Sequence, residues 1–401
     1  MSCLFLAVTK SRRLRLILWA QVAVAIVALL VPTYAAQRER LPRDRVLDKD
    51  MEFKRDASTG ELEAGPANAA SETQALPTTG AIRASVELVQ VGCTVIALDG
   101  TQVRGLSRDD FRVFEDGAEQ AITSFDAAST PASIALLLDD SPSVYRELGE
   151  TREAARSLAR SLSPDDEVAV AAFAGQTHLL LPFSRNRTLL ADALASPTLK
   201  VVANSSQSFI YQALYLTAHE LFHNRTGRKA IVLLTDGEDS GLGLNWNPAS
   251  MEPHPGAASP LSFDDVAREL SSQGISLYVI STEGRPKAMT DAWLTENQRD
   301  PLIGDEAHRL EMPLDSLYLA EMVRQVSGNL YFLREIGGLA EVYRRIALEL
   351  GAQYTLGYYP AHRSALPGWR ELGVELRNGS TTAPAGSRVI HRTAYYMQGA
   401  H

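Results

Sequence analysis

The central part of the chain alternates short apolar runs with segments in which apolar residues recur at helical spacing. Runs of consecutive apolar residues, bounded by polar or glycine-containing stretches, are typical of strands that are buried on both faces. Val144, Leu148, Ala155, Leu158 and Leu162 recur at helical spacing and give one buried helix face. The strands that we predict are Ile134–Leu138, Val168–Phe173, Ala230–Leu234, Ile275–Ile280 and Leu330–Leu333, with His178–Leu181 as an antiparallel edge strand. This alternation predicts an α/β domain with a doubly wound, mostly parallel, Rossmann-like sheet.

Shorter segments of alternating apolar and polar residues flank this domain on both sides. Before it, Asp99-Gly100 and Asp116-Gly117 mark turns between predicted strands. After it, we predict the strands Gln353–Tyr359, Arg370–Leu376 and Arg388–Tyr396. Each flank has about 45 residues, which is too few to enclose a core alone. We therefore predict one small β-sandwich formed from residues 83–127 and 352–401, with the α/β domain, residues 128–351, inserted into it.

The N-terminal segment has the pattern of an export signal. Lys10, Arg12, Arg13 and Arg15 precede an apolar run from Leu16 to Val31. This run is shorter than the roughly 20 residues that cross a bilayer comfortably, which favours cleavage over anchoring. We predict that residues 1–36 are a signal peptide or membrane anchor and that residues 37–82, which lack apolar periodicity, are a disordered linker. The protein is then exported across the inner membrane and is periplasmic, secreted or anchored by its N-terminus.

Charge and motif content exclude several classes of function. The formal net charge is -9 and the basic residues form no stripe beyond the N-terminus, which argues against a nucleic-acid partner. No G-x-G-x-x-G follows the first predicted strand, and the chain has no Walker loop and no G-x-S-x-G elbow. Nucleotide-binding and hydrolase interpretations of the sheet therefore lack the residues they need. We expect a protein that is not an enzyme.

Oxygen-bearing side chains follow two of the predicted buried strands. The first strand ends in Asp139-Asp140-Ser141-Pro142-Ser143, and a later one ends in Leu-Thr-Asp-Gly, which contains Asp236. The carboxyl ends of parallel strands meet at one edge of a sheet, and ligands bind there near the point where the strand order reverses. Carboxylate and hydroxyl oxygens are the ligands that Mg²⁺ prefers. The sequence thus predicts an all-oxygen cation site at this edge.

In these motifs the chain resembles the von Willebrand factor type A family, whose metal-ion-dependent adhesion site combines a D-x-S-x-S loop with a threonine and an aspartate from two further loops. The resemblance implies that Asp139, Ser141, Ser143 and Asp236 bind a divalent cation, Mg²⁺ or alternatively Mn²⁺ or Ca²⁺. Ser208 stands where the family has threonine, with Ser205 or Ser206 as substitutes. The resemblance also implies that the bound cation keeps one coordination position open for a carboxylate presented by a protein partner.

The resemblance extends to the flanks of the domain. A secreted bacterial subgroup, first described in Acidobacteria, places a signal peptide and a short β module before the type A domain, and Gly105–Gly117 and Gln353–Pro360 resemble that module and its closing strand. The irregular loop from Leu242 to Pro260 follows Asp236 and should overhang the cation. We expect Trp246 in this loop, together with Asp140, to contact the partner.

Two other interpretations remain open. His219-Glu220-Leu221-Phe222-His223 matches the H-E-x-x-H pattern of zinc peptidases, although the glycine and third histidine of the longer pattern are absent. This motif lies eleven residues after Ser208, roughly 16 Å along a helix, and so belongs to a different place from the predicted cation site. Alternatively the chain is a structural scaffold with a degenerate site, in which Asp139 and Asp236 only cap the elements that follow.

Overall fold

The structure is a computed structural model of the 401-residue chain. It describes residues 45–47, 51–55, 62–66, 88–99, 101–127, 130–141, 144, 154, 157–158, 160–194, 207–241, 260–290, 314–335, 338–361, 368–377, 382–392 and 394–397. The predicted signal segment, residues 1–36, lies outside the described residues. In the described part of the chain no helix is both long enough and apolar enough to span a membrane.

A seven-stranded sheet forms the centre of the α/β domain, in the order β1-β10-β9-β8-β11-β12-β13. Its strands are β1 (Arg45–Val46), β8 (Ala132–Asp139), β9 (Glu167–Phe173), β10 (Thr177–Ser184), β11 (Arg228–Thr235), β12 (Ile275–Ser281) and β13 (Gly328–Phe332). Strands β9, β8, β11, β12 and β13 run parallel to one another, and β10 is antiparallel to β9, as the sequence predicts. The prediction that residues 178–181 form the edge of the sheet is wrong, because β1 pairs with the outer side of β10. Every residue of β8 and β11 is buried, because layers of helix cover both faces of the sheet.

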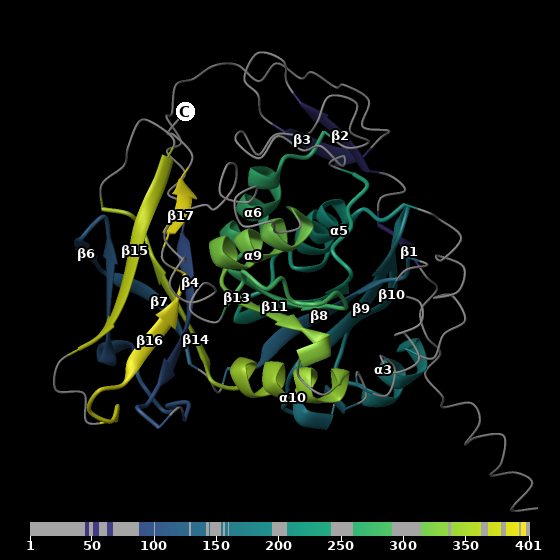
Figure 1. Cartoon of the computed structure of the whole chain (residues 1–401). Coiled ribbons are helices and arrows are strands. Elements are labelled where there is room, and N and C mark those ends of the chain that lie inside the picture. Colours follow the sequence, from purple (N-terminus) through teal and green to yellow (C-terminus); the bar gives the residue numbers. More distant parts are fainter. Residues whose placement is uncertain are drawn as a thin grey trace, which may run out of the picture. The chain divides into compact units, whose positions relative to one another are not determined.

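The helices lie on the two faces of this sheet (Figure 1). They are α3 (Arg187–Leu194), α5 (Ile210–Leu216), α6 (Phe263–Ser272), α9 (Leu314–Val326) and α10 (Leu339–Leu350). Helices α5, α6 and α9 cover one face, where their apolar side chains join those of the strands in one buried cluster, and α3 and α10 lie on the other. Helix α6 begins in a capping box, in which the Ser262 hydroxyl accepts the Asp265 N–H and the Asp265 carboxylate accepts the Ser262 N–H. The predicted α/β class and mostly parallel sheet are confirmed.

Two four-stranded sheets form the β-sandwich, with the orders β16-β4-β14-β7 and β17-β15-β5-β6. Their strands are β4 (Val89–Ile96), β5 (Phe111–Glu115), β6 (Ala118–Gln120), β7 (Ile122–Asp126), β14 (Gln353–Tyr358), β15 (Gly368–Leu376), β16 (Arg388–His391) and β17 (Ala394–Met397). In both sheets, strands from before the α/β domain pair with strands from after it. The Glu115 carboxylate accepts hydrogen bonds from Tyr358 and Tyr395 at 2.6 and 2.8 Å, which joins the two sheets inside the core.

One predicted strand of the sandwich is two strands in the structure. Residues 388–396 were expected to run through one sheet, but β16 pairs with β4 and β17 pairs with β15 of the other sheet. The chain changes sheets at Arg392, whose buried guanidinium donates to the carbonyls of Gln90 and Gln325. The apolar pattern of the sequence does not show the break, because the two halves alternate in the same way.

The prediction that residues 37–82 form a disordered linker is wrong for three short segments. Strand β1 pairs with the sheet edge at β10, and β2 (Met51–Arg55) and β3 (Leu62–Pro66) form a hairpin. The Phe53 ring packs edge to face on Tyr215, with 5.5 Å between the ring centroids. Strands of two to five residues are too short to show periodicity, and pairing with an existing sheet edge depends on backbone groups that a sequence pattern does not reveal.

The two connections between the sandwich and the α/β domain meet at one side chain. Arg228, the first residue of β11, is 4% exposed, and its guanidinium donates to the carbonyls of Thr130 and Leu350. Thr130 lies on the connection into the domain, and Leu350 ends α10 just before the chain returns to the sandwich. Arg228 therefore fixes the entry and the exit of the inserted domain against each other.

Replacing Arg228 by methionine should lower the free energy of unfolding by about 2 kcal/mol. Methionine fills similar volume but leaves the buried Leu350 carbonyl and the half-buried Thr130 carbonyl without their charged donor, whose hydrogen bonds contribute roughly 1.5–3 kcal/mol. Urea unfolding of the full chain measures the effect. Arg388→Met, at an exposed position of β16, is the control and should change stability by less than about 0.5 kcal/mol. Equal effects of the two substitutions would contradict the role given to Arg228.

Candidate metal centre

The strand order of the large sheet reverses between β8 and β11. Strands β9 and β10 extend the sheet on the β8 side, and β12 and β13 extend it on the β11 side. Both strands are parallel neighbours, and they end in Asp139 and Thr235, respectively. The carboxyl ends of the strands at such a switch point form the usual ligand-binding crevice of a doubly wound sheet.

Asp139 is the residue at which three loops meet. Its side chain is fully buried, and one carboxylate oxygen, Oδ2, accepts hydrogen bonds from Thr235 Oγ1 at 2.7 Å and from Ser208 Oγ at 3.3 Å. The other oxygen, Oδ1, accepts the backbone N–H of Ser141 at 3.0 Å. The structure thus brings together Asp139, Ser141 and Ser208, which the sequence predicted as neighbours although 69 residues separate the first from the last.

Ser208 is held in place by the loop that follows β11. Its carbonyl accepts the Ser240 N–H at 2.7 Å, and its own N–H donates to the Ser240 hydroxyl at 3.2 Å. The next residue, Phe209, donates its N–H to the carbonyl of Ala174 beyond β9. The start of α5 is therefore tied to the strand ends on both sides of the switch point, and this fixes the Ser208 hydroxyl beside Asp139.

Asp236 completes the set on the β11 side. It is 8% exposed, and its Oδ1 accepts the Glu238 N–H at 3.0 Å within a tight turn. Gly237 in this turn has a φ of +98°, and a Cβ there would lie 3.2 Å from a methyl carbon of Leu319. The turn after Asp236 thus needs glycine both for its backbone conformation and for its close approach to α9.

Negative charge accumulates at this edge of the sheet. Burial raises the pKa of Asp139 to about 6, and the charge of Asp236 adds to the rise, whereas hydrogen bonds from Thr235 and Ser141 oppose it. Burial, together with the charges of Glu238 and Asp236, also raises the pKa of Asp315, at the start of α9, to about 6. A cation at this edge would relieve the cost of keeping these carboxylates ionised.

The donor set fits a hard divalent cation. Asp139, Ser141, Ser208 and Asp236 are all buried and offer only oxygen atoms, which suits Mg²⁺ and excludes a thiolate or imidazole site. Among the described residues no three His, Cys, Asp or Glu side chains are grouped to hold a metal, so the hydroxyls have to supply part of the coordination. Ser143 and Trp246 lie outside the described residues.

Asp140 does not fit the partner contact expected of it. Its side chain is fully buried, and its backbone N–H donates to the Phe173 carbonyl at 2.8 Å. The residue after Asp139 is thus turned into the protein beside β9 instead of toward a partner, because this hydrogen bond continues the sheet by one residue. Successive side chains of a strand point to opposite faces, and the sequence did not show where the strand ends. From the sequence, the Asp140 side chain could therefore point either into the protein or toward a partner.

Thr235 and Asp315 belong to the site but were not predicted. Thr235 donates to Asp139 and accepts the Gly237 N–H at 3.0 Å, so it aligns both the carboxylate and the turn. Thr235 could have been predicted from the sequence, because it directly precedes Asp236 at the end of a buried strand. Asp315 is brought to the site by α9, 79 residues after Asp236 in the chain, and no local pattern marks it.

The H-E-x-x-H motif lies on a separate helical segment. Thr217–Leu221, labelled η2, continues α5 as a π-helix and contains His219 and Glu220, and His223 follows it. Nδ1 of His219 lies 3.2 Å from Oε1 of Glu269 on α6. In the part of the chain that the structure describes, no third side chain joins the two histidines as a zinc peptidase would require.

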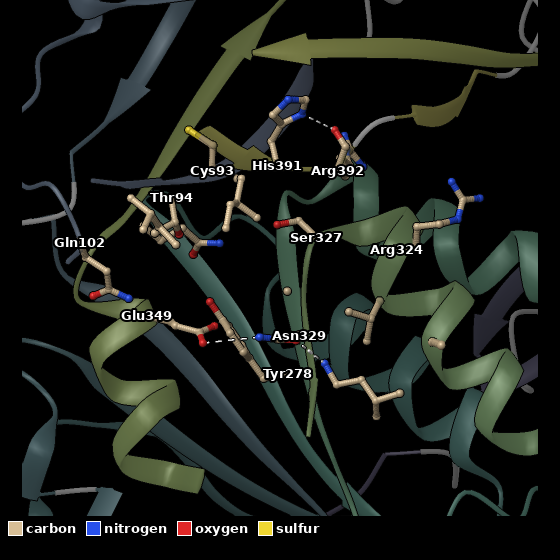
Figure 2. Close-up of a pocket in the computed structure, with 18 residues that line it drawn as sticks. Cys93, Thr94, Gln102, Tyr278, Arg324, Ser327, Asn329, Glu349, His391 and Arg392 are labelled. Atoms are coloured by element: carbon tan, nitrogen blue, oxygen red, sulfur yellow. Dashed lines mark hydrogen bonds between the residues drawn. The ribbon is translucent and has the colours of Figure 1, made fainter. Parts of the chain in front are cut away.

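A cavity of about 240 Å³ lies between the sandwich and the edge of the large sheet, lined by residues of β4, β12, β13, β16 and α9 (Figure 2). Its charged side chains interact with the protein itself. Arg324 pairs with Glu321, and Glu349 accepts a hydrogen bond from Tyr331. Gln353 Nε2 donates to Ser276 Oγ at 2.6 Å across the junction. The cavity contains none of the predicted metal-binding residues and forms part of the packing between sandwich and domain.

Comparison with known proteins identifies the inserted domain. Residues 133–300 match the family model of the von Willebrand factor type A domain. The chain therefore carries a von Willebrand factor type A domain, a protein-interaction module of a family whose members generally bind a divalent metal. The search of curated proteins gives no match. The proposed likeness to the Acidobacterial subgroup stays a prediction.

Solved structures give likenesses of low sequence identity. An aerotolerance-related membrane protein from Bacteroides fragilis is 17% identical, with a TM-score of 0.36, over 55% of this chain and 98% of that one. A von Willebrand factor type A protein from Catenulispora acidiphila is 12% identical, with a TM-score of 0.38, over 75% and 76%. The manganese-loaded TRAP protein of Plasmodium vivax is 14% identical, with a TM-score of 0.36, over 70% and 97%. The family match carries the assignment of the domain.

Proposed function

We propose that the protein is an exported binding protein that holds Mg²⁺ at the switch point of its type A domain and uses it to capture a carboxylate on a protein partner. The observation that carries this proposal is the convergence of three loops on the buried Asp139 carboxylate. No catalytic group is needed for such a role, and the protein then acts by binding alone. Export follows from the basic and apolar pattern of the N-terminal segment.

Each residue has a separate part in this function. Asp139, Ser208 and Thr235 form a hydrogen-bonded frame that fixes the oxygen atoms before the cation arrives. Ser141 and Asp236 supply further oxygens around the same point, and the D-x-S-x-S pattern of the sequence adds Ser143 as a ligand. When bound, the cation provides a positive charge with a coordination position that is open to an acidic group of the partner. Mn²⁺ or Ca²⁺, which also prefer oxygen ligands, are the alternative cations.

Magnesium binding should be lost when two of these oxygen donors are removed. Isothermal titration of Mg²⁺ and Mn²⁺ into the metal-stripped full chain is expected to show one site in the wild type. In the Ser141→Ala, Asp236→Ala double variant that site should disappear, because one hydroxyl and one carboxylate are gone.

A second double variant, Ser262→Ala with Asp265→Ala, is the matched control. It removes the same two residue types at equally buried positions, in the capping box of α6, and should still bind Mg²⁺. Loss of binding in both variants would point to general unfolding. No binding in the wild type would leave the scaffold with a degenerate site as the better interpretation, and peptide hydrolysis that depends on zinc and His223 would favour the peptidase.

A further inference from the structure

Two histidines lie side by side on the surface of the domain, outside the candidate metal centre. His219 and His223 are four residues apart, and their ring centroids are separated by 6.5 Å with 43° between the ring planes. The His219 side chain is 37% exposed, and His223 is exposed. Although His223 lies in the turn after η2, its ring is close enough to that of His219 for a single cation to contact both after a rotation of the exposed His223 side chain.

The structure fixes one of the two rings. His219 stacks on Tyr215, with 5.6 Å between centroids and 16° between planes, and its Nδ1 lies 3.2 Å from Oε1 of Glu269. Glu269 in turn accepts the side-chain amide of Gln273 at 2.8 Å. A carboxylate at Nδ1 selects the neutral tautomer that carries its proton there, which leaves the lone pair on Nε2.

This arrangement has the form that protein metal sites use around a histidine ligand. A histidine that binds a metal through one nitrogen almost always donates its other N–H to a carboxylate, carbonyl or water, which sets the ring orientation and makes the ligand more basic. Glu269 has that position toward His219. The His223 side chain is exposed, so it can change rotamer and turn its ring toward the same point.

We propose that His219 and His223 form a second cation site, independent of the magnesium centre, which takes a transition metal that favours imidazole, Zn²⁺, Ni²⁺ or Cu²⁺. Imidazole suits these cations and not Mg²⁺, so the two sites of the protein differ in the metal they select. Two protein ligands leave the remaining coordination positions to water. The site is therefore one of binding, and it requires no third ligand and no peptidase activity.

The test is a titration of Zn²⁺ and Ni²⁺ into the full chain in the presence of saturating Mg²⁺, with a chromogenic chelator as the competitor. The wild type should take up one equivalent of Zn²⁺, and Cu²⁺ should bind more tightly than Ni²⁺ or Zn²⁺. His223→Ala, at an exposed position, should lose this equivalent. Glu269→Gln keeps the shape of the side chain but removes its charge, and should weaken Zn²⁺ binding by about 10- to 100-fold.

Two controls separate this proposal from the magnesium centre. His178→Ala removes a partly exposed histidine on β10, and the Ser141→Ala, Asp236→Ala variant removes oxygen donors; both should still bind the Zn²⁺ equivalent. The proposal is overturned if the wild type binds no Zn²⁺ once Mg²⁺ is saturating, or if His223→Ala binds as much as the wild type. It is equally overturned if the Ser141, Asp236 double variant loses the zinc equivalent.

Discussion

Replacing Asp139 by asparagine should abolish magnesium binding and at the same time stabilise the metal-free protein by about 3 kcal/mol at pH 8. Asparagine has nearly the same shape and can keep hydrogen bonds to Ser141, Ser208 and Thr235, but it brings no negative charge. The binding loss follows because the central carboxylate of the site is gone. The gain in stability follows because a fully buried carboxylate is costly to ionise when no cation is near it.

The pH dependence of this difference has a definite sign. Burial raises the pKa of Asp139 to about 6 in the fold, against an ordinary value near 3.9. The folded state thus holds the proton more tightly than the unfolded state, and wild-type stability relative to the variant falls as the pH rises from about 4 to about 6. Below about pH 4 the two proteins should be equally stable, and above about pH 7 the full difference should be present.

Urea unfolding in the presence of a chelator, at pH 4.5, 6 and 8, measures this difference in free energy. Asp265→Asn is the matched control, because Asp265 is also buried but caps a helix start, where its charge is favourable. That variant should lose stability and retain magnesium binding. If Asp139→Asn were less stable than the wild type at pH 8, the buried Asp139 charge would not destabilise the metal-free protein. A central reason for placing Mg²⁺ at this edge would then fail.

The sequence predicted those parts of the fold that depend on local pattern. Strands β8 and β11 were visible as apolar runs, and the positions of Asp139 and Asp236 at their carboxyl ends followed from the parallel sheet. The insertion into a sandwich followed from the size of the two flanks. These inferences needed only periodicity, chain length and the known geometry of parallel strands.

What the sequence did not predict depends on contacts between distant residues. The pairing of β1 with β10 and the packing of Phe53 on Tyr215 join segments more than 130 residues apart. Arg228 acts through the carbonyls of Thr130 and Leu350, which have no side-chain signature at all. The inward turn of Asp140 depends on one backbone hydrogen bond to Phe173. Backbone acceptors and edge pairing are set by tertiary structure, so residue patterns contain little information about them.

Gly328→Ala should lower the free energy of unfolding by at least about 4 kcal/mol, the largest loss of stability expected of any change discussed. Gly328 begins β13 and pairs with Leu277 of β12, with a φ of +130° that other residues rarely adopt. A Cβ at this position would lie 1.9 Å from the Leu277 carbonyl oxygen. Because this contact is with the backbone of β12, which cannot rotate away as a side chain can, the edge strand β13 would have to move away from β12.

Gly338→Ala separates the clash from the backbone strain. Gly338, at the start of α10, has a φ of +117°, and a Cβ there would meet no atom within 4 Å. In that variant only the unfavourable backbone conformation should matter, and the free energy of unfolding should fall by about 1–3 kcal/mol. Magnesium affinity, measured on the folded fraction, should be unchanged in both, because β13 is separated from β11 by β12 in the sheet. Equal destabilisation by the two substitutions would show that strain, and not the close approach of β13 to β12, requires glycine at position 328.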